Sequence, residues 1–120
     1  GSVVEQTLYY INQYRAQEGK YPLKLAGAAE MSATQLRAQE AVGYKSHTRP
    51  DGRSYKTAFT DIGLSHENVV EVLVFGLGGP AEKVKVWMNS PVHRNVLMRT
   101  NITHIALGVS GSLYAGIVYK

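Results

Sequence analysis

Histidine and glutamate side chains in three separate stretches are the groups in this sequence best suited to chemistry. His47 lies within SHTRPDG, Glu67 within HENV, and His93 within SPVHRN. Two neutral imidazoles and one carboxylate are a ligand set that suits Zn²⁺ and leaves one position for water. A metal held in this way lowers the pKa of the bound water and supports hydrolysis. We therefore predict that these three side chains meet in one cleft.

Without a metal, the same three groups would still form a titrating cluster. A carboxylate that faces two imidazoles raises their pKa and makes a cleft responsive to pH. Neither interpretation supplies a nucleophile, because Ser46 and Ser90 only lie near the histidines in sequence and such neighbours point in different directions. A structural role also stays open for each group, since loop histidines and Glu67 can bind backbone polar groups instead of a ligand. We assign no catalytic residue.

Turn and cap residues indicate how helices would position these groups. Ser90 can cap a helix whose first residue is Pro91, which places His93 in the first turn of that helix. The sequence around His47 forms a loop, because Arg-Pro-Asp-Gly favours a tight turn. Apolar residues at helical spacing predict further helices over residues 3–17, 26–42, 55–62 and 80–88.

Strand signals concentrate in the second half of the chain. Residues 105–109 and 113–119 are rich in apolar residues and flank Ser-Gly-Ser, which predicts a hairpin. The valine-rich residues 68–75 are either a strand or an irregular buried segment. Helices followed by short strands favour an α+β fold in which helices pack on an antiparallel sheet.

Composition restricts the chain to one globular domain over residues 1–120, of which Gly1 and Ser2 are expected to be a cloning remnant. Hydrophobic residues make up 44% and charged residues 18% of the sequence. No apolar run approaches the roughly 20 residues of a transmembrane segment. The absence of cysteine excludes disulfides and thiol nucleophiles. The net charge is +4, but the basic residues are scattered, so we expect no nucleic-acid partner.

Three motifs, taken in their order along the chain, resemble those of a known family. INQYR at residues 11–15 is followed by Gly19 and by Pro-Leu; SHTRPDGRS follows at 46–54; and WMNSPVHRNVL at 87–97 precedes Thr-His-Ile and Gly-Val. In this order they resemble the CAP superfamily of cysteine-rich secretory proteins, antigen 5 and pathogenesis-related 1 proteins. The bacterial SCP-like domains of that family are the most similar.

The resemblance implies an α-β-α sandwich, in which a small antiparallel sheet lies between helices beside an open cleft. It implies a secreted, extracellular or cell-surface protein. The function it favours is a binding or interaction module for a lipid, a peptide or a cell-wall component. The alternative is a metal-dependent hydrolase that acts on a peptide or a wall polymer. In some family members the cleft histidines hold a divalent metal, here expected to be zinc or calcium.

By motif matching, the resemblance places His47 and His93 as the two cleft histidines and Glu67 as the acid of the family's Gly-Glu-Asn motif. The glycine of that motif is His66 here, which adds a further candidate ligand, and Asn68 completes the binding set. Family members carry a second cleft acid near the tryptophan of the preceding helix. The nearest acids in this sequence, Glu71 and Glu82, do not match the motif, so that position stays unassigned.

Overall fold

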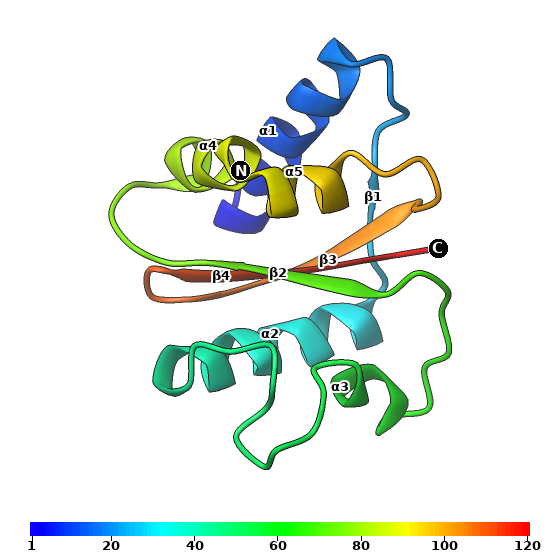
Figure 1. Cartoon of the computed structure of the whole chain (residues 1–120), viewed down its shortest axis with the longest axis vertical. Helices are drawn as coiled ribbons and strands as arrows, with labels where there is room; N and C mark the ends of the chain where they lie inside the picture. The colour runs from blue at the N-terminus through cyan, green and yellow to red at the C-terminus, as the bar shows by residue number, and fades with distance from the viewer.

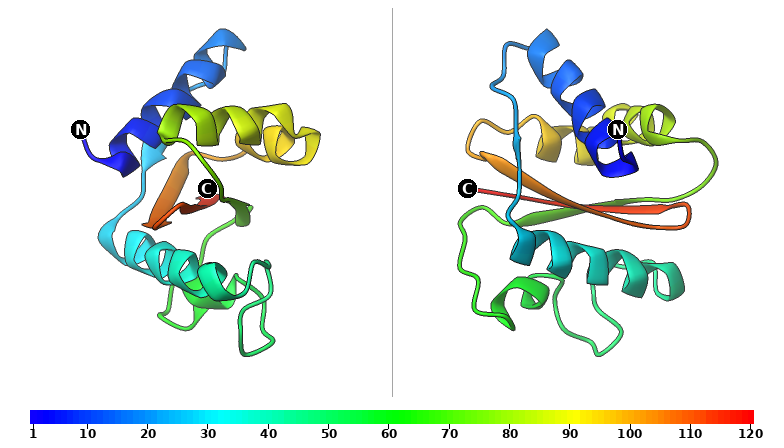
Figure 2. Two further views of the ribbon diagram at one scale, coloured as in Figure 1. Left: turned by 90° about the vertical axis from the view of Figure 1, so that its left-hand side faces the viewer. Right: turned by 180° about the vertical axis from the view of Figure 1, so that it is seen from behind.

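The computed structural model describes all 120 residues, and helices cover both faces of a central sheet (Figure 1). The elements are α1 (Val3–Gln17), β1 (Lys24–Leu25), α2 (Ala28–Gly43), α3 (Thr57–Thr60), β2 (Val70–Val74), α4 (Pro80–Asn89), α5 (Pro91–Leu97), β3 (His104–Ser110) and β4 (Leu113–Tyr119). Helices α1, α4 and α5 lie on one face of the sheet, and α2 and α3 lie on the other (Figure 2). The predicted α-β-α sandwich of the α+β class is confirmed.

The four strands are arranged in the order β1-β3-β4-β2. The predicted hairpin is formed by β3 and β4, which pair antiparallel from His104↔Tyr119 to Ser110↔Leu113. Strand β2 pairs antiparallel with β4, so it forms one edge of the sheet. The two-residue strand β1 is the exception to the predicted antiparallel sheet, because it pairs parallel with β3.

Local signals explain where several elements begin and end. Helix α1 covers the predicted residues, and Ser2 and Glu5 exchange side-chain and backbone hydrogen bonds of 3.1 Å in a capping box at its start. Helix α3 is shorter than predicted, because the Tyr55 N–H donates to the His47 carbonyl instead of beginning a helix. Strand β2 begins only at Val70, since Asn68 adopts a left-handed conformation with φ of 58°.

Two hydrophobic layers bury the two faces of the sheet. Trp87 of α4 and Leu97 of α5 are fully buried against Ile105 and its neighbours on the strands. On the other face the contacts are made by small side chains of α2, such as Ala38, and by Phe59 of α3. No helix in the structure has both the length and the apolar character needed to cross a bilayer.

Gly108 in β3 is the point at which the sheet and helix α2 come closest. A Cβ atom at this position would lie 2.6 Å from the Thr34 carbonyl oxygen and 2.7 Å from the Gln35 Cα. Both are backbone atoms of α2, so a side chain could be accommodated only if the helix moved.

Substitution Gly108→Ala is therefore expected to lower the free energy of unfolding by about 1–3 kcal/mol, the usual cost of overpacking. Urea unfolding followed by circular dichroism measures the effect. Gly43→Ala at the end of α2 is the matched control, because no atom lies within 4 Å of its added Cβ. Equal stability of the two variants would show that the close approach to α2 is not restrictive.

Candidate functional site

A pocket of about 220 Å³ lies beside the edge strand β2 and contains both predicted cleft histidines. His47 comes from the loop after α2, and His93 comes from the first turn of α5. The lining residues are His47, Tyr55, Val70, Glu71, Val72, Val92, His93 and Val96. The pocket thus has mostly apolar walls and a small number of polar groups, as ligand sites commonly do.

The carboxylate in this pocket belongs to Glu71, whose side chain is fully buried. Its Oε2 accepts a hydrogen bond of 2.7 Å from Arg37 Nε, and its Oε1 accepts one of 2.9 Å from Arg37 Nη2. This is the bidentate geometry in which an arginine and a carboxylate bind most strongly. Arg37 lies on α2 and is also fully buried. The charge of Glu71 is therefore neutralised inside the protein.

Arg37 keeps its proton firmly in this environment. Burial acts to lower its pKa, but hydrogen bonds and charges from Glu71 and Glu40 outweigh burial and raise the pKa above its ordinary value. The same guanidinium donates to the Ser46 carbonyl at 2.8 Å, immediately before His47. Arg37 therefore holds both the buried carboxylate and the loop that carries the first histidine.

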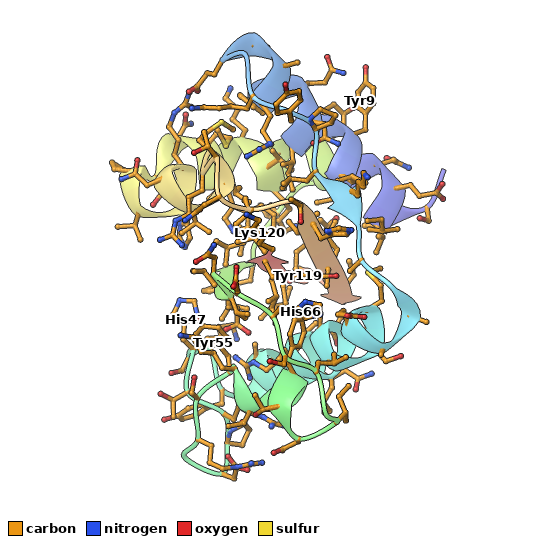
Figure 3. All side chains as sticks on the ribbon, turned by 90° about the vertical axis from the view of Figure 1, so that its right-hand side faces the viewer. Tyr9, His47, Tyr55, His66, Tyr119 and Lys120 are labelled. Carbon is orange, nitrogen blue, oxygen red and sulfur yellow. The ribbon has the colours of Figure 1, made fainter.

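His47 binds Glu71 directly and presents the rest of its ring outward. Its Nδ1 lies 2.9 Å from Glu71 Oε1, and about half of its side chain is exposed. The ring packs edge-on against Tyr55 with centroids 5.9 Å apart, and Figure 3 shows the two side chains next to each other. The loop is fixed at its base by Arg49, which binds Glu40 at 2.9 Å and Thr57 at 3.0 Å.

His93 occupies the first turn of α5, where Pro91 is the first helical residue as predicted. Its Nδ1 is the only fully buried side-chain nitrogen or oxygen in the structure without a hydrogen-bond partner. The pKa of His93 lies below its ordinary value of 6.5. Burial is the larger cause, and the positive charge that His47 can carry is the smaller one. The neutral imidazole is therefore the stable form in this pocket.

The lowered pKa of His93 predicts that the protein loses stability in mild acid. Below the ordinary pKa the unfolded chain binds a proton at this position before the folded protein does, so acid favours unfolding. The free energy of unfolding should fall as the pH drops below 6.5, until the folded-state pKa is passed. His93→Gln should flatten this part of the profile, whereas Lys85→Gln on an exposed position should keep it. Urea titrations between about pH 5 and pH 8 measure the slope; an unchanged slope in His93→Gln would contradict the assignment.

Glu67 does not reach this pocket, and the predicted acid has to be corrected to Glu71. The backbone of Glu67 pairs with Lys120 at the end of β4, and its side chain is exposed. The reason is the left-handed turn at Asn68, which delays the start of β2. The acid whose side chain points from β2 toward α2 is therefore Glu71, four residues further along the chain. The Glu-Asn pair in the sequence was a misleading match.

His66 and Asn68 also lie outside the pocket that contains His47 and His93. They line a separate cavity of about 450 Å³ next to α3. His66 Nε2 lies 2.7 Å from Glu30 Oε2, and its ring packs on Tyr119 with centroids 4.0 Å apart (Figure 3). The Asn68 side chain donates to the Asn101 carbonyl at 2.9 Å. Both side chains thus have partners within the fold.

The ligand set predicted for zinc or calcium, His47, His93 and Glu67, is not brought together. No group of three or more histidine, cysteine, aspartate or glutamate side chains in the structure is arranged to hold a metal ion. Glu71 would be the replacement acid, but both of its oxygens already accept hydrogen bonds from Arg37. The guanidinium charge next to them also repels a second cation. The residues present therefore do not fit a resident divalent metal.

Glu71, which lines the pocket, and Arg37, which binds it from α2, were not among the predicted site residues. One signal for Glu71 was available, because an acid within the run VVEVLV interrupts an otherwise apolar strand. Charged residues are rarely buried without a partner, so such an interruption indicates an ion pair. The partner itself lies 34 positions earlier in the chain, and no local pattern relates the two.

The three-layer fold and the two-histidine pocket at the sheet edge define a CAP domain. Residues 8–115 match the family model described as the cysteine-rich secretory protein family, CAP, and the chain belongs to this family. It is 32% identical over 115 residues to the uncharacterized protein YkwD of Bacillus subtilis (strain 168). That match covers 93% of this chain and 43% of YkwD, so the chain spans less than half of this relative's length.

Solved structures share the fold at lower sequence identity. An extracellular protein of Bacillus anthracis that contains an SCP domain aligns with a TM-score of 0.90 and 16% identity, over 97% of this chain and 39% of that one. An outer surface protein of Borrelia burgdorferi aligns with a TM-score of 0.85 and 17% identity, over 98% of this chain and 92% of that one. At these identities the likeness concerns the fold alone.

Proposed function

We propose that this domain is an extracellular binding module whose pocket receives an uncharged polar group of a cell-wall glycopeptide. One observation carries the proposal. Arg37 occupies both oxygens of Glu71, whereas the Nδ1 of His93 is buried beside the pocket without a partner. Because Nδ1 itself is sealed from solvent, an entering hydroxyl or amide group would bind the other ring nitrogen of His93, Nε2, which makes no hydrogen bond within the protein.

Charge and size both favour this class of ligand. The buried ion pair is neutral overall and His93 is held in its neutral form, so the pocket floor offers no net charge to an ionic group. The volume of about 220 Å³ is below the range of about 300–1,000 Å³ that is typical for whole small ligands. The pocket therefore suits one group of a longer molecule, and this favours a glycopeptide over a lipid tail.

The extracellular assignment is supported by the relatives. The Bacillus anthracis protein is described as extracellular and the Borrelia burgdorferi protein as an outer surface protein. Both contain the same fold as this chain. A wall component would be accessible to a domain at that location.

Binding is favoured over hydrolysis by the state of the acid. A hydrolase needs a free general base or an activated water in addition to the groups that bind substrate. Both oxygens of Glu71 already accept hydrogen bonds from Arg37, and Oε1 also lies 2.9 Å from His47 Nδ1, so this carboxylate serves as an internal partner and is not a free base. His47 and His93 then remain as hydrogen-bonding groups for a ligand.

Calorimetric titration with soluble muropeptides tests the proposal. The protein should bind them, and His93→Leu should weaken binding about tenfold, because one buried hydrogen bond is worth about 1–1.5 kcal/mol. His66→Leu is the matched control, since His66 lines a different cavity and should leave the affinity unchanged. Equal loss in both variants, or no binding by the unmodified protein, would overturn the proposal. Release of cleaved products that depends on His93 would support the hydrolase instead.

A further inference from the structure

A third cavity, of about 600 Å³, opens where the end of α1, strand β1 and the segment before β3 meet. It shares no lining residue with the histidine pocket. Its volume lies within the range of about 300–1,000 Å³ that binds small molecules. Neither histidine of the first pocket takes part, so any ligand here would be independent of the function proposed above.

The cavity is lined by a buried arginine that has no acidic partner. Arg15 is 2% exposed. It forms none of the ion pairs in the structure, so its guanidinium nitrogens lie more than 4 Å from every carboxylate oxygen. Burial lowers its pKa. A buried charge is normally paired, since removing it from water is costly. No acidic side chain therefore neutralises the positive charge of Arg15.

Most of the guanidinium is already bound to backbone carbonyls. Its Nε donates to the Tyr21 carbonyl at 2.7 Å, and its Nη1 donates to the carbonyls of Leu97 at 2.7 Å and Arg99 at 3.0 Å. The remaining nitrogen, Nη2, makes no hydrogen bond within the protein. Nη2 is also in contact with solvent. If it were fully buried it would be a buried polar atom without a partner, and His93 Nδ1 is the only such atom in the structure. The Nη2 amino group of Arg15 is thus available from outside.

The rest of the cavity lining adds further positive charge. Lys20 and Lys24 line it and add two positive charges. Glu18 is the only acid in the lining, and it is ion-paired with Arg94 of α5. Ile102 and the largely exposed ring of Tyr21 supply apolar walls. The cavity therefore combines unneutralised cations with apolar surface.

We propose that this cavity binds a phosphate group carried by a molecule with an apolar part. A tetrahedral phosphate directs oxygens toward several separate donors, such as Nη2 of Arg15 and the ammonium groups of Lys20 and Lys24. A planar carboxylate is recognised best by two parallel N–H groups of one arginine, and Nε and Nη1 of Arg15 are already engaged. Phosphate is therefore favoured over carboxylate.

Nuclear magnetic resonance titrations with three probes test this site and separate the sources of the phosphate. The probes are inorganic phosphate, glycerol 3-phosphate, and dihexanoyl phosphatidylglycerol below its micelle concentration. The expected result is a shift of the Arg15 Nε resonance and of the backbone amides of residues 20, 21, 23, 24 and 100–103 with at least one probe. Tighter binding of the lipid identifies a lipid headgroup, whereas equal affinities identify a small phosphate.

The double variant Lys20→Gln/Lys24→Gln should weaken binding about tenfold or more, because two charge-assisted contacts are lost. Lys24 is exposed, Lys20 is half-buried, and neither forms an ion pair, so this variant should fold. Lys56→Gln/Lys85→Gln has the same net charge and is the control. Equal affinity of the two double variants, or no shift at about 10 mM of any probe, would overturn the proposal. His93→Leu should leave phosphate binding intact, so failure here and failure of the muropeptide proposal are distinguishable.

Discussion

Replacing Arg37 with methionine should lower the free energy of unfolding by about 3–5 kcal/mol, the cost of leaving a buried charge without its partner. Both side chains of the Arg37–Glu71 pair are fully buried, and Arg37 supplies two of the three hydrogen bonds that Glu71 accepts. Urea unfolding at pH 7 measures the effect. Arg53→Met is the control, because the ion pairs of Arg53 are exposed and surface pairs of this kind contribute little to stability.

A second substitution separates the cost of the unpaired charge from lost packing. In Arg37→Met/Glu71→Leu no buried charge remains, and apolar replacements of buried ion pairs are often neutral or stabilising. The double variant should therefore be more stable than Arg37→Met alone. If it is less stable, packing around the guanidinium rather than charge compensation determines the loss. The single variant Arg37→Met is also expected to release His47 from its present position. His47 binds Glu71, and Arg37 holds both Glu71 and the Ser46 carbonyl just before His47.

Trp87→Ala should destabilise the protein by a similar amount, about 3–5 kcal/mol. Trp87 is fully buried in the core between α4 and the sheet, so alanine would leave a large cavity. Its indole N–H also donates to the Leu73 carbonyl at 3.0 Å, on the strand that carries Glu71. Loss of the ring removes both the packing and this link to β2.

Two further variants divide the effect of Trp87 into its parts. Trp87→Phe keeps an aromatic ring and loses the hydrogen bond, so it should cost clearly less than alanine. Val86→Ala, at the neighbouring and exposed position, should change stability by no more than about 0.5 kcal/mol. Thermal unfolding followed by circular dichroism compares the three. A cost for Trp87→Ala as small as that of Val86→Ala would contradict its place in the core.

Helices and the hairpin could be predicted from the sequence because their signals are local. The first helix was predicted over residues 3–17 and is found there, since its apolar spacing ends before Gly19. The predicted hairpin is present; β4 has the predicted bounds, and β3 extends one residue further than predicted at each end. Pro91 correctly indicated the start of the helix that carries His93. In each case neighbouring residues contain the deciding information.

Strand β1 and the acid of the pocket could not be predicted, because they depend on partners that are distant in the chain. Strand β1 has only two residues and exists because it pairs with β3, about 80 positions later, so no periodicity could indicate it. The acid of the pocket depends on where β2 begins, and this is set by the backbone conformation of Asn68. Motif matching named two histidines that the structure places in one pocket, but the glutamate beside them is Glu71 and not Glu67, because a short sequence match does not fix the register of a strand.

The buried pair on β2 has a further consequence for the behaviour of the protein in solution. The outer side of β2 pairs with no strand, and its sequence, VEVLV, is otherwise strongly apolar and prone to β structure. Such an edge can act as a template for another chain and so start aggregation. Glu71 opposes this while the chain is unfolded, because strands of this segment stacked on one another would bury the carboxylate without Arg37. The residue that shapes the pocket therefore also protects this segment against pairing with a second chain before the fold is complete.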